Sequence, residues 1–129
     1  MFSAAKIRGR WRAVRISQRI VGGVAVIDVQ GRITAGEGVE TLRDKVNSLL
    51  HQGHRNLILN LSAVDYLDSA GLGEIVGAYA TVRRQAGSLK LVGLTSRIRD
   101  LLSITKLLTV FDTFDSEQDA VRSFSSVNV

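Results

Sequence analysis

A hydroxyl that could accept a phosphoryl group stands where two expected elements meet. Ser69 follows an acid, Asp68, at a point where an apolar strand has ended and a helix begins. We therefore expect its hydroxyl to lie close to the free backbone N–H groups of Ala70, Gly71 and Leu72. These groups and the helix dipole favour a phosphoryl group on Ser69, whereas Asp68 repels one. The alternative is that Ser69 is only a helix N-cap, a role that needs one suitable residue and no chemistry.

Glycines follow this serine at short intervals. Gly71 and Gly73 lack a Cβ atom, so another backbone, or the active site of a partner, can approach the turn closely. Gly77 lies four residues after Gly73 and continues the same helix face. The spacing predicts close packing of this face against the sheet or against a partner.

The composition limits the protein classes. The chain has 129 residues, of which 45% are hydrophobic, and these values predict one globular domain. No window has the roughly 18 unbroken apolar residues of a membrane span, and the first residues lack the apolar region of a secretory signal, so we expect a cytoplasmic protein. The absence of cysteine excludes disulfides, thiolate chemistry and cysteine metal sites.

The net charge of +5 is concentrated near the start of the chain. Six basic residues precede the first acid, Asp28, and the rest of the chain has eleven basic and twelve acidic residues. We therefore expect a basic arm over residues 1–13 and a near-neutral domain over residues 14–129. Trp11 is alone among the arginines of the arm, so the sequence predicts no specific nucleic-acid binding.

The hydrophobic patterns predict an α/β domain, in which strands alternate with helices. Two β-branched runs, 14–20 and 24–31, flank Gly22-Gly23 and predict an antiparallel hairpin. After this hairpin, further strands are expected at 56–62, 88–94 and 109–114, and helices at 37–53, about 69–86, 96–107 and 115–124. A short loop through Val64, Tyr66 and Leu67 is expected to lead to Ser69. The fold class is a mixed sheet, with this hairpin and parallel strands, and helices packed against it.

The string DSAGLGEIVGAY, behind LNLSAVDYL, resembles the signature of the STAS family, and in particular of bacterial anti-sigma factor antagonists. The resemblance covers most of the chain, since IDVQGRITAGEGVETLRDKV and LKLVGLTSRIRDLLSITKLLTVFDTFDSEQDAV also resemble the family. It implies that Ser69 is the phosphoacceptor, that Asp68 is its acidic neighbour, and that Gly71 and Gly73 are the glycines of the turn.

The function implied by this resemblance is partner switching. The unphosphorylated domain would bind an anti-sigma factor that is also a GHKL-type serine kinase, and a sigma factor would be released. Phosphorylation of Ser69 would end the binding, and a phosphatase would reset the switch. The kinase would hold ATP and Mg²⁺, so this chain is expected to be a regulator with no cofactor or metal and no enzyme activity of its own. The partner face is expected around Ser69 with Thr34, Tyr66, Glu74 and Arg97, and dimerisation of the chain is left open.

Two departures from the family pattern keep an alternative open. Arg32 stands where the family often has an acid, and Ala70 replaces a common second Ser or Thr. Because a charge at the rim of an interface selects partners, the change at Arg32 bears more on the partner than on the acceptor. The alternative is a STAS interaction module that does not switch, such as a subunit of a lipid-transport ABC system or of a stressosome-like scaffold.

Readings from other classes fit the residues less well. A dinucleotide-binding glycine turn needs an acid about 20 residues later, where Gly93 and Leu94 stand. A phosphorylated-aspartate receiver domain needs clustered acids for Mg²⁺, and the early strand offers only Asp28. A serine hydrolase elbow needs glycine two residues before the serine, where Leu67 stands.

Overall fold

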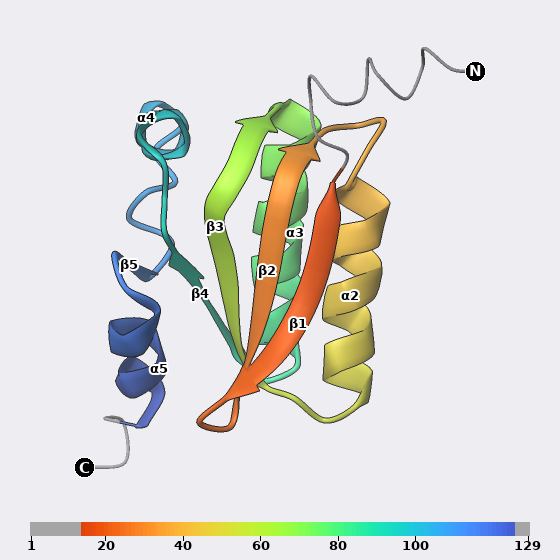
Figure 1. Ribbon diagram of the computed structural model, residues 1–129, viewed down its shortest axis with the longest axis vertical. Helices are drawn as coiled ribbons and strands as arrows, with labels where there is room; N and C mark the ends of the chain where they lie inside the picture. The colour runs from red at the N-terminus through yellow and green to blue at the C-terminus, as the bar shows by residue number, and fades with distance from the viewer. Residues whose placement is uncertain (1–13, 126–129) are drawn as a thin grey trace.

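The fold is a five-stranded sheet with helices on both of its faces. The computed structural model describes residues 14–125, so the expected basic arm over residues 1–13 lies outside the described residues. The elements in chain order are β1 Arg15–Val21, β2 Val24–Ile33, α2 Val39–His51, β3 Asn56–Leu67, α3 Ser69–Arg84, β4 Ser88–Val92, α4 Ser96–Ile104, β5 Thr113–Phe114 and α5 Glu117–Ser125 (Figure 1).

The strands lie in the order β1-β2-β3-β4-β5. The pair β1–β2 is antiparallel, and every later pair is parallel. Gly22 and Gly23 connect the first pair with φ of 57° and 80°, and both values lie in the left-handed region that glycine adopts without strain. The predicted fold class is confirmed, including the hairpin and the mixed sheet.

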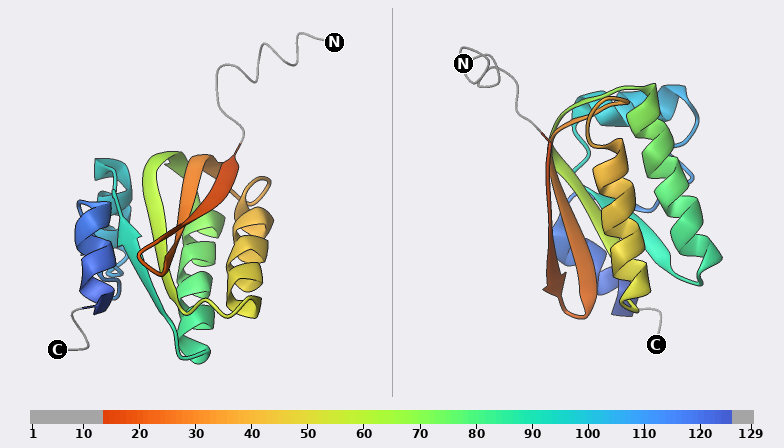
Figure 2. Two further views of the ribbon diagram at one scale, coloured as in Figure 1. Left: turned by 60° about the horizontal axis from the view of Figure 1, so that its bottom comes forward. Right: turned by 90° about the vertical axis from the view of Figure 1, so that its right-hand side faces the viewer.

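The two faces of the sheet are covered by different helices. Successive side chains of a strand point to opposite faces, so β2 and β3 contribute to two cores. Ala25, Ile27, Leu57 and Leu59 belong to the larger core, where α2 and α3 pack side by side on one face (Figure 2). On the opposite face, α5 covers a smaller core made of Val24, Val26, Ile58, Val92 and Ala120. In the described part of the chain, no helix is long and apolar enough to span a bilayer.

Two predicted strands have other bounds: the strand expected over 109–114 is only β5, Thr113–Phe114, and the boundary of β3 affects the site. The strand expected over 56–62 continues as β3 to Leu67, and the loop expected through Val64 and Tyr66 is absent. The longer strand forms because the carboxyl half of β2 pairs with it, with Gly31 beside Val64 and Ile33 beside Leu67. Ser69 therefore follows the end of a central strand after only one residue, Asp68, which fixes its position closely.

Candidate functional site

The helix that carries Ser69 is capped by Asp68. This acid has extended backbone angles, and its carboxylate Oδ1 accepts a hydrogen bond of 2.8 Å from the backbone N–H of Gly71. Ser69 is instead the first residue of α3. The alternative role of Ser69 as the N-cap is therefore wrong, because the acid one residue earlier occupies that position.

The expected free N–H groups beside Ser69 are also largely occupied. The N–H of Gly71 donates to the Asp68 side chain, and the N–H of Leu72 donates to the Asp68 carbonyl oxygen at 2.9 Å. The Ser69 side chain is exposed. The serine thus presents a hydroxyl to solvent from a backbone held by its neighbours, and a phosphate there would compete with Asp68 for these donors.

Asp68 also connects the start of α3 to the end of β2. Its Oδ2 accepts a hydrogen bond of 3.2 Å from the N–H of Ala35, and its own N–H donates to the carbonyl oxygen of Ile33 at 3.3 Å. The hydrogen bond from Gly71 lowers the pKa of the Asp68 carboxyl, and the hydrogen bond from Ala35 lowers it by a smaller amount, since both stabilise the ionised form. Asp68 is therefore anionic at neutral pH, and it connects the start of α3 to the end of β2 beside Ser69.

The glycines of the turn have different surroundings. A Cβ atom on Gly71 would lie 2.2 Å from the carbonyl oxygen of Ile33 and 2.7 Å from Cδ1 of Leu67, so this glycine lets α3 begin against β2. Around Gly73 and Gly77 an added Cβ would meet no described atom within 4 Å. The predicted packing of Gly73 and Gly77 against the sheet is wrong, because they lie on the exposed face of α3. That face continues from Ser69 at intervals of four residues.

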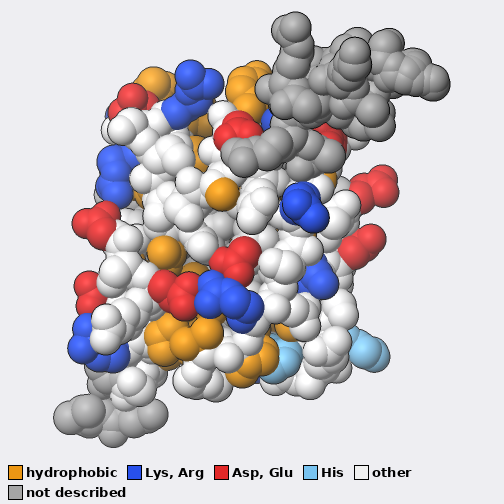
Figure 3. Space-filling model, in the orientation of Figure 1, with side chains coloured by type: hydrophobic (Ala, Val, Ile, Leu, Met, Phe, Trp, Pro, Cys, Tyr) orange, Lys and Arg blue, Asp and Glu red, His pale blue; other side chains and the backbone are white. Residues whose placement is uncertain are grey.

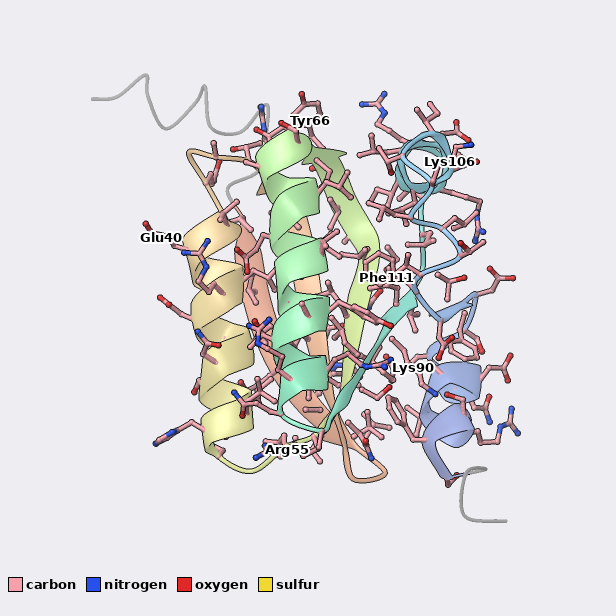
Figure 4. All side chains as sticks on the ribbon, turned by 180° about the vertical axis from the view of Figure 1, so that it is seen from behind. Glu40, Arg55, Tyr66, Lys90, Lys106 and Phe111 are labelled. Atoms are coloured by element: carbon pink, nitrogen blue, oxygen red, sulfur yellow. The ribbon has the colours of Figure 1, made fainter. Side chains whose placement is uncertain are left out.

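Two residues expected on the partner face lie at the same end of the sheet as Ser69. Thr34 directly follows β2, and its backbone bonds to Glu37 in the turn that leads to α2. Tyr66 is 41% exposed at the end of β3, near the start of α3 (Figure 4). The guanidinium of Arg32 lies 5.1 Å from the centroid of the Tyr66 ring, within the range of a cation–π contact. The reversed charge at Arg32 is thus part of the surface near the Ser69 end.

The other two residues of the expected face differ from each other. Arg97 is exposed in the first turn of α4, which begins after the carboxyl end of β4. Glu74 is only 8% exposed, and its carboxylate lies 2.9 Å from the guanidinium of Arg43 on α2. Glu74 therefore joins the two helices of the larger core. Its side chain is buried, so the expectation that it lies on the exposed partner face is corrected.

The residues that sequence reasoning missed act through contacts between distant segments. Ile33 and Ala35 contribute backbone groups, which carry no signal in the residue type. Arg43 is 31 positions from Glu74, and only the packing of α2 against α3 brings the pair together. No basic residue lies three or four positions from Glu74, so the pattern within α3 gave no sign of its partner.

Comparison with known proteins identifies the family. The family model described as STAS domain matches residues 15–120. The chain belongs to the STAS family. A STAS relative, the anti-sigma-B factor antagonist of Bacillus subtilis, is 38% identical over 99 residues, which cover 74% of this chain and 89% of that protein.

Two solved structures share the STAS fold. An anti-sigma factor antagonist from Mycobacterium paratuberculosis matches with a TM-score of 0.76 and 22% identity, over 86% of this chain and 93% of that chain. The Bacillus cell fate determinant SpoIIAA in its phosphorylated form matches with a TM-score of 0.66 and 21% identity, over 87% and 99%. At these identities the structures establish the fold alone.

Proposed function

We propose that this chain is an anti-sigma factor antagonist whose binding is switched by phosphorylation of Ser69. The observation that carries the proposal is the exposed Ser69 hydroxyl at the first position of α3, on a backbone held by Asp68. The similarity to an anti-sigma-B factor antagonist over 74% of the chain supports the class of partner. A sigma factor acts on transcription in the bacterial cytoplasm, so the proposal places the protein there.

The switch consists of two group transfers. In the first, Ser69 Oγ attacks the γ-phosphorus of ATP in the active site of the kinase, its proton passes to a base of the kinase, and the bond to ADP breaks. In the second, a phosphatase hydrolyses the phosphoserine with water and restores the hydroxyl. This chain contributes the nucleophile and the geometry around it, and the kinase contributes ATP, Mg²⁺ and the base.

The charge of the phosphate explains the loss of binding. A phosphoserine carries about −1.5 to −2 charges at neutral pH. Because the nearest helix N–H groups already donate to Asp68, the new anion has few free donors on its own chain. It stays on the surface beside an ionised carboxylate. Burying this pair against a partner costs desolvation and repulsion, so the phosphorylated surface dissociates.

The face offered to the partner follows from the exposed residues around Ser69. Gly73 and Gly77 leave the exposed side of α3 without side chains, so a partner can approach that helix closely. Tyr66 supplies an exposed aromatic ring, and Thr34 and Arg97 extend the face along the carboxyl end of the sheet. Glu74 is not part of this proposed face, because it is buried beside Arg43.

The experiment is a reaction with the serine kinases encoded in the same genome, with ATP and Mg²⁺, followed by intact mass measurement and mapping of the modified residue. One phosphate on Ser69, and a complex with the unmodified form that is lost after modification, are the expected results. Ser69→Ala is the control and should stay unmodified. Transfer to another residue, or a complex that survives phosphorylation of Ser69, would contradict the proposal.

One observation favours a second candidate function. The family often has an acid at the position of Arg32, whose guanidinium lies over the ring of Tyr66. The charge of the surface near Ser69 is therefore opposite in sign to the usual one. A STAS module that binds a scaffold or a transport complex without switching fits this difference. Absence of phosphate on Ser69 with every kinase tested, together with stable copurification of such a complex, is the result that this candidate predicts.

A further inference from the structure

β1 is an edge strand, and its hydrogen-bonding pattern follows from the hairpin. Gly22 and Gly23 form a two-residue loop in which both φ angles are positive, as in a type I′ turn. The pair that closes such a loop, Val21 and Val24, exchanges hydrogen bonds, and bonded and non-bonded pairs then alternate along the regular β1–β2 register. Every second residue of β1 therefore points its N–H and C=O away from the sheet, namely Ile16, Gln18 and Ile20.

These outward groups form an open edge. Among the residues that the structure describes, no hydrogen bond reaches the outward backbone of Ile16, Gln18 or Ile20. The N–H of Val14, which has the same orientation, donates to the Glu37 carboxylate at 2.9 Å and so ends the open stretch. The side chain of Ile20 is 54% exposed beside this open edge. An open edge with an exposed isoleucine is suited to a further strand.

We propose that this strand is β1 of a second copy of the chain, paired antiparallel about a two-fold axis at Gln18. In this register Gln18 faces Gln18 of the second copy, and Ile16 faces Ile20 in both directions. The order RISQRIV is thus self-complementary about its centre. In each strand, Ile16, Gln18 and Ile20 have six outward N–H and C=O groups, and all six are then hydrogen-bonded to the other strand. Each exposed Ile20 is covered by Ile16 of the other copy.

The arginines of β1 select this register. Arg15 and Arg19 point to the other face of the sheet, where Arg15 would face Val21 of the second copy and Arg19 would face Ser17. Sliding the second strand by two residues in one direction places Arg15 opposite Arg19, and sliding it in the other places Arg19 opposite Arg19. Directly opposed like charges destabilise an antiparallel pair, so the register centred on Gln18 is preferred.

The side chain of Arg19 is held in place within each copy. Its guanidinium bonds to the carboxylate of Asp28 at 2.6 Å and to that of Glu117 at 2.6 Å. Basic and acidic side chains accordingly lie side by side on this face of the molecule (Figure 3). Arg19 is held over the sheet face instead of shielding the open edge. The paired strands involve no residue of the Ser69 site, so this inference stands apart from the proposed function.

The first test is the oligomeric state of the full chain, measured by analytical ultracentrifugation over a range of concentrations. A monomer–dimer equilibrium is expected. Ile20→Lys should shift it to the monomer, because it places a cation opposite Ile16 and removes the apolar pair. Val110→Lys is the matched control, since Val110 is also an exposed apolar residue, at 43%, and lies outside β1; it should leave the dimer intact. A monomer at every concentration, or a dimer that survives Ile20→Lys, would overturn the proposal.

The second test reads the register directly. The chain has no cysteine, so a single introduced thiol is a clean probe. Cα atoms of a hydrogen-bonded antiparallel pair lie about 5.5 Å apart, which a disulfide can span. Gln18→Cys should therefore form a covalent dimer under mild oxidation. Ser17→Cys should form little, because it faces Arg19 of the second copy. Equal cross-linking of both variants, or none of Gln18→Cys, would exclude this pairing.

Discussion

The carboxylate of Asp68 lies 2.8 Å from the backbone nitrogen of Gly71, and the same carboxylate receives the N–H of Ala35 from the turn after β2. Through these two contacts one acid fixes the first turn of α3, the end of β2 and the backbone of Ser69. The helix start is thus held by Asp68, and the serine hydroxyl is left free for another role.

The first prediction concerns this cap. Asp68→Ala removes the acceptor for Gly71 and should lower the urea midpoint of unfolding, whereas Asp68→Asn keeps a side-chain oxygen and should lower it less. The pKa of the Asp68 carboxyl is lower in the folded chain, so its contribution is present above the unfolded pKa and is lost as the pH falls through the folded pKa. Equal midpoints for the alanine and asparagine variants would contradict the role of the cap.

The second prediction compares two glycines of the same helix. Gly71→Ala places a Cβ atom 2.2 Å from the Ile33 carbonyl oxygen and should cost about 1–3 kcal/mol of stability, because backbone must move. Gly73→Ala meets open space and should gain about 0.5–1 kcal/mol from helix propensity. Urea unfolding of the two variants measures both values. The reverse order of stability would show that Gly71 is not the point of close approach.

The hairpin and the amphipathic helices could be predicted because their signals are local. Gly22-Gly23 between two β-branched runs allows few other structures, and α2 has its apolar residues at helical spacing. The length of β3 could not be predicted in this way. Polar residues such as Ser62 and Asp65 resemble a loop in isolation, and only the pairing with β2 keeps this segment extended.

The positions of Asp68 and Ser69 at the start of a helix could be predicted, but their local structural roles could not. Asp68 and Ser69 are adjacent and are both good N-cap residues, so a shift of one position exchanges their functions. Propensity does not resolve such a shift, whereas the end of β3 at Leu67 does. The burial of Glu74 depends on Arg43 in another helix, and a pattern read along one segment contains no information on such a pair.

The third prediction concerns the loss of stability at low pH. The hydrogen bond from Arg19 lowers the pKa of the Asp28 carboxyl in the folded chain, and the hydrogen bond from Asn60 lowers it by a smaller amount. A carboxyl of this kind contributes stability above its unfolded pKa, and the contribution is lost as the pH falls through the folded pKa, here below about pH 4. Unfolding free energy measured against pH should therefore fall less steeply for Asp28→Asn than for the wild type. The same slope for both would show that this pair does not contribute to the acid sensitivity.

The fourth prediction concerns the buried carboxylate. Arg43→Met leaves Glu74 without its cation in a position that is only 8% exposed, and it should cost about 1–3 kcal/mol. Adding Glu74→Gln to this variant removes the unpaired charge and should recover part of the loss. A double-mutant cycle from urea unfolding gives the coupling between the two side chains. Strictly additive effects would mean that the contact between α2 and α3 does not depend on this pair.

The fifth prediction separates the hydroxyl from the charge at the proposed switch. Ser69→Ala should bind the proposed kinase partner and should not be released by ATP, whereas Ser69→Asp places a second carboxylate beside Asp68 and should bind on the order of tenfold more weakly. The double variant Asp68→Asn/Ser69→Asp has one carboxylate and should recover much of the affinity, since asparagine still caps α3. Calorimetric titration with the partner measures all three dissociation constants. Equal binding by Ser69→Ala and Ser69→Asp would remove charge at this position from the mechanism and would leave the fold unaffected.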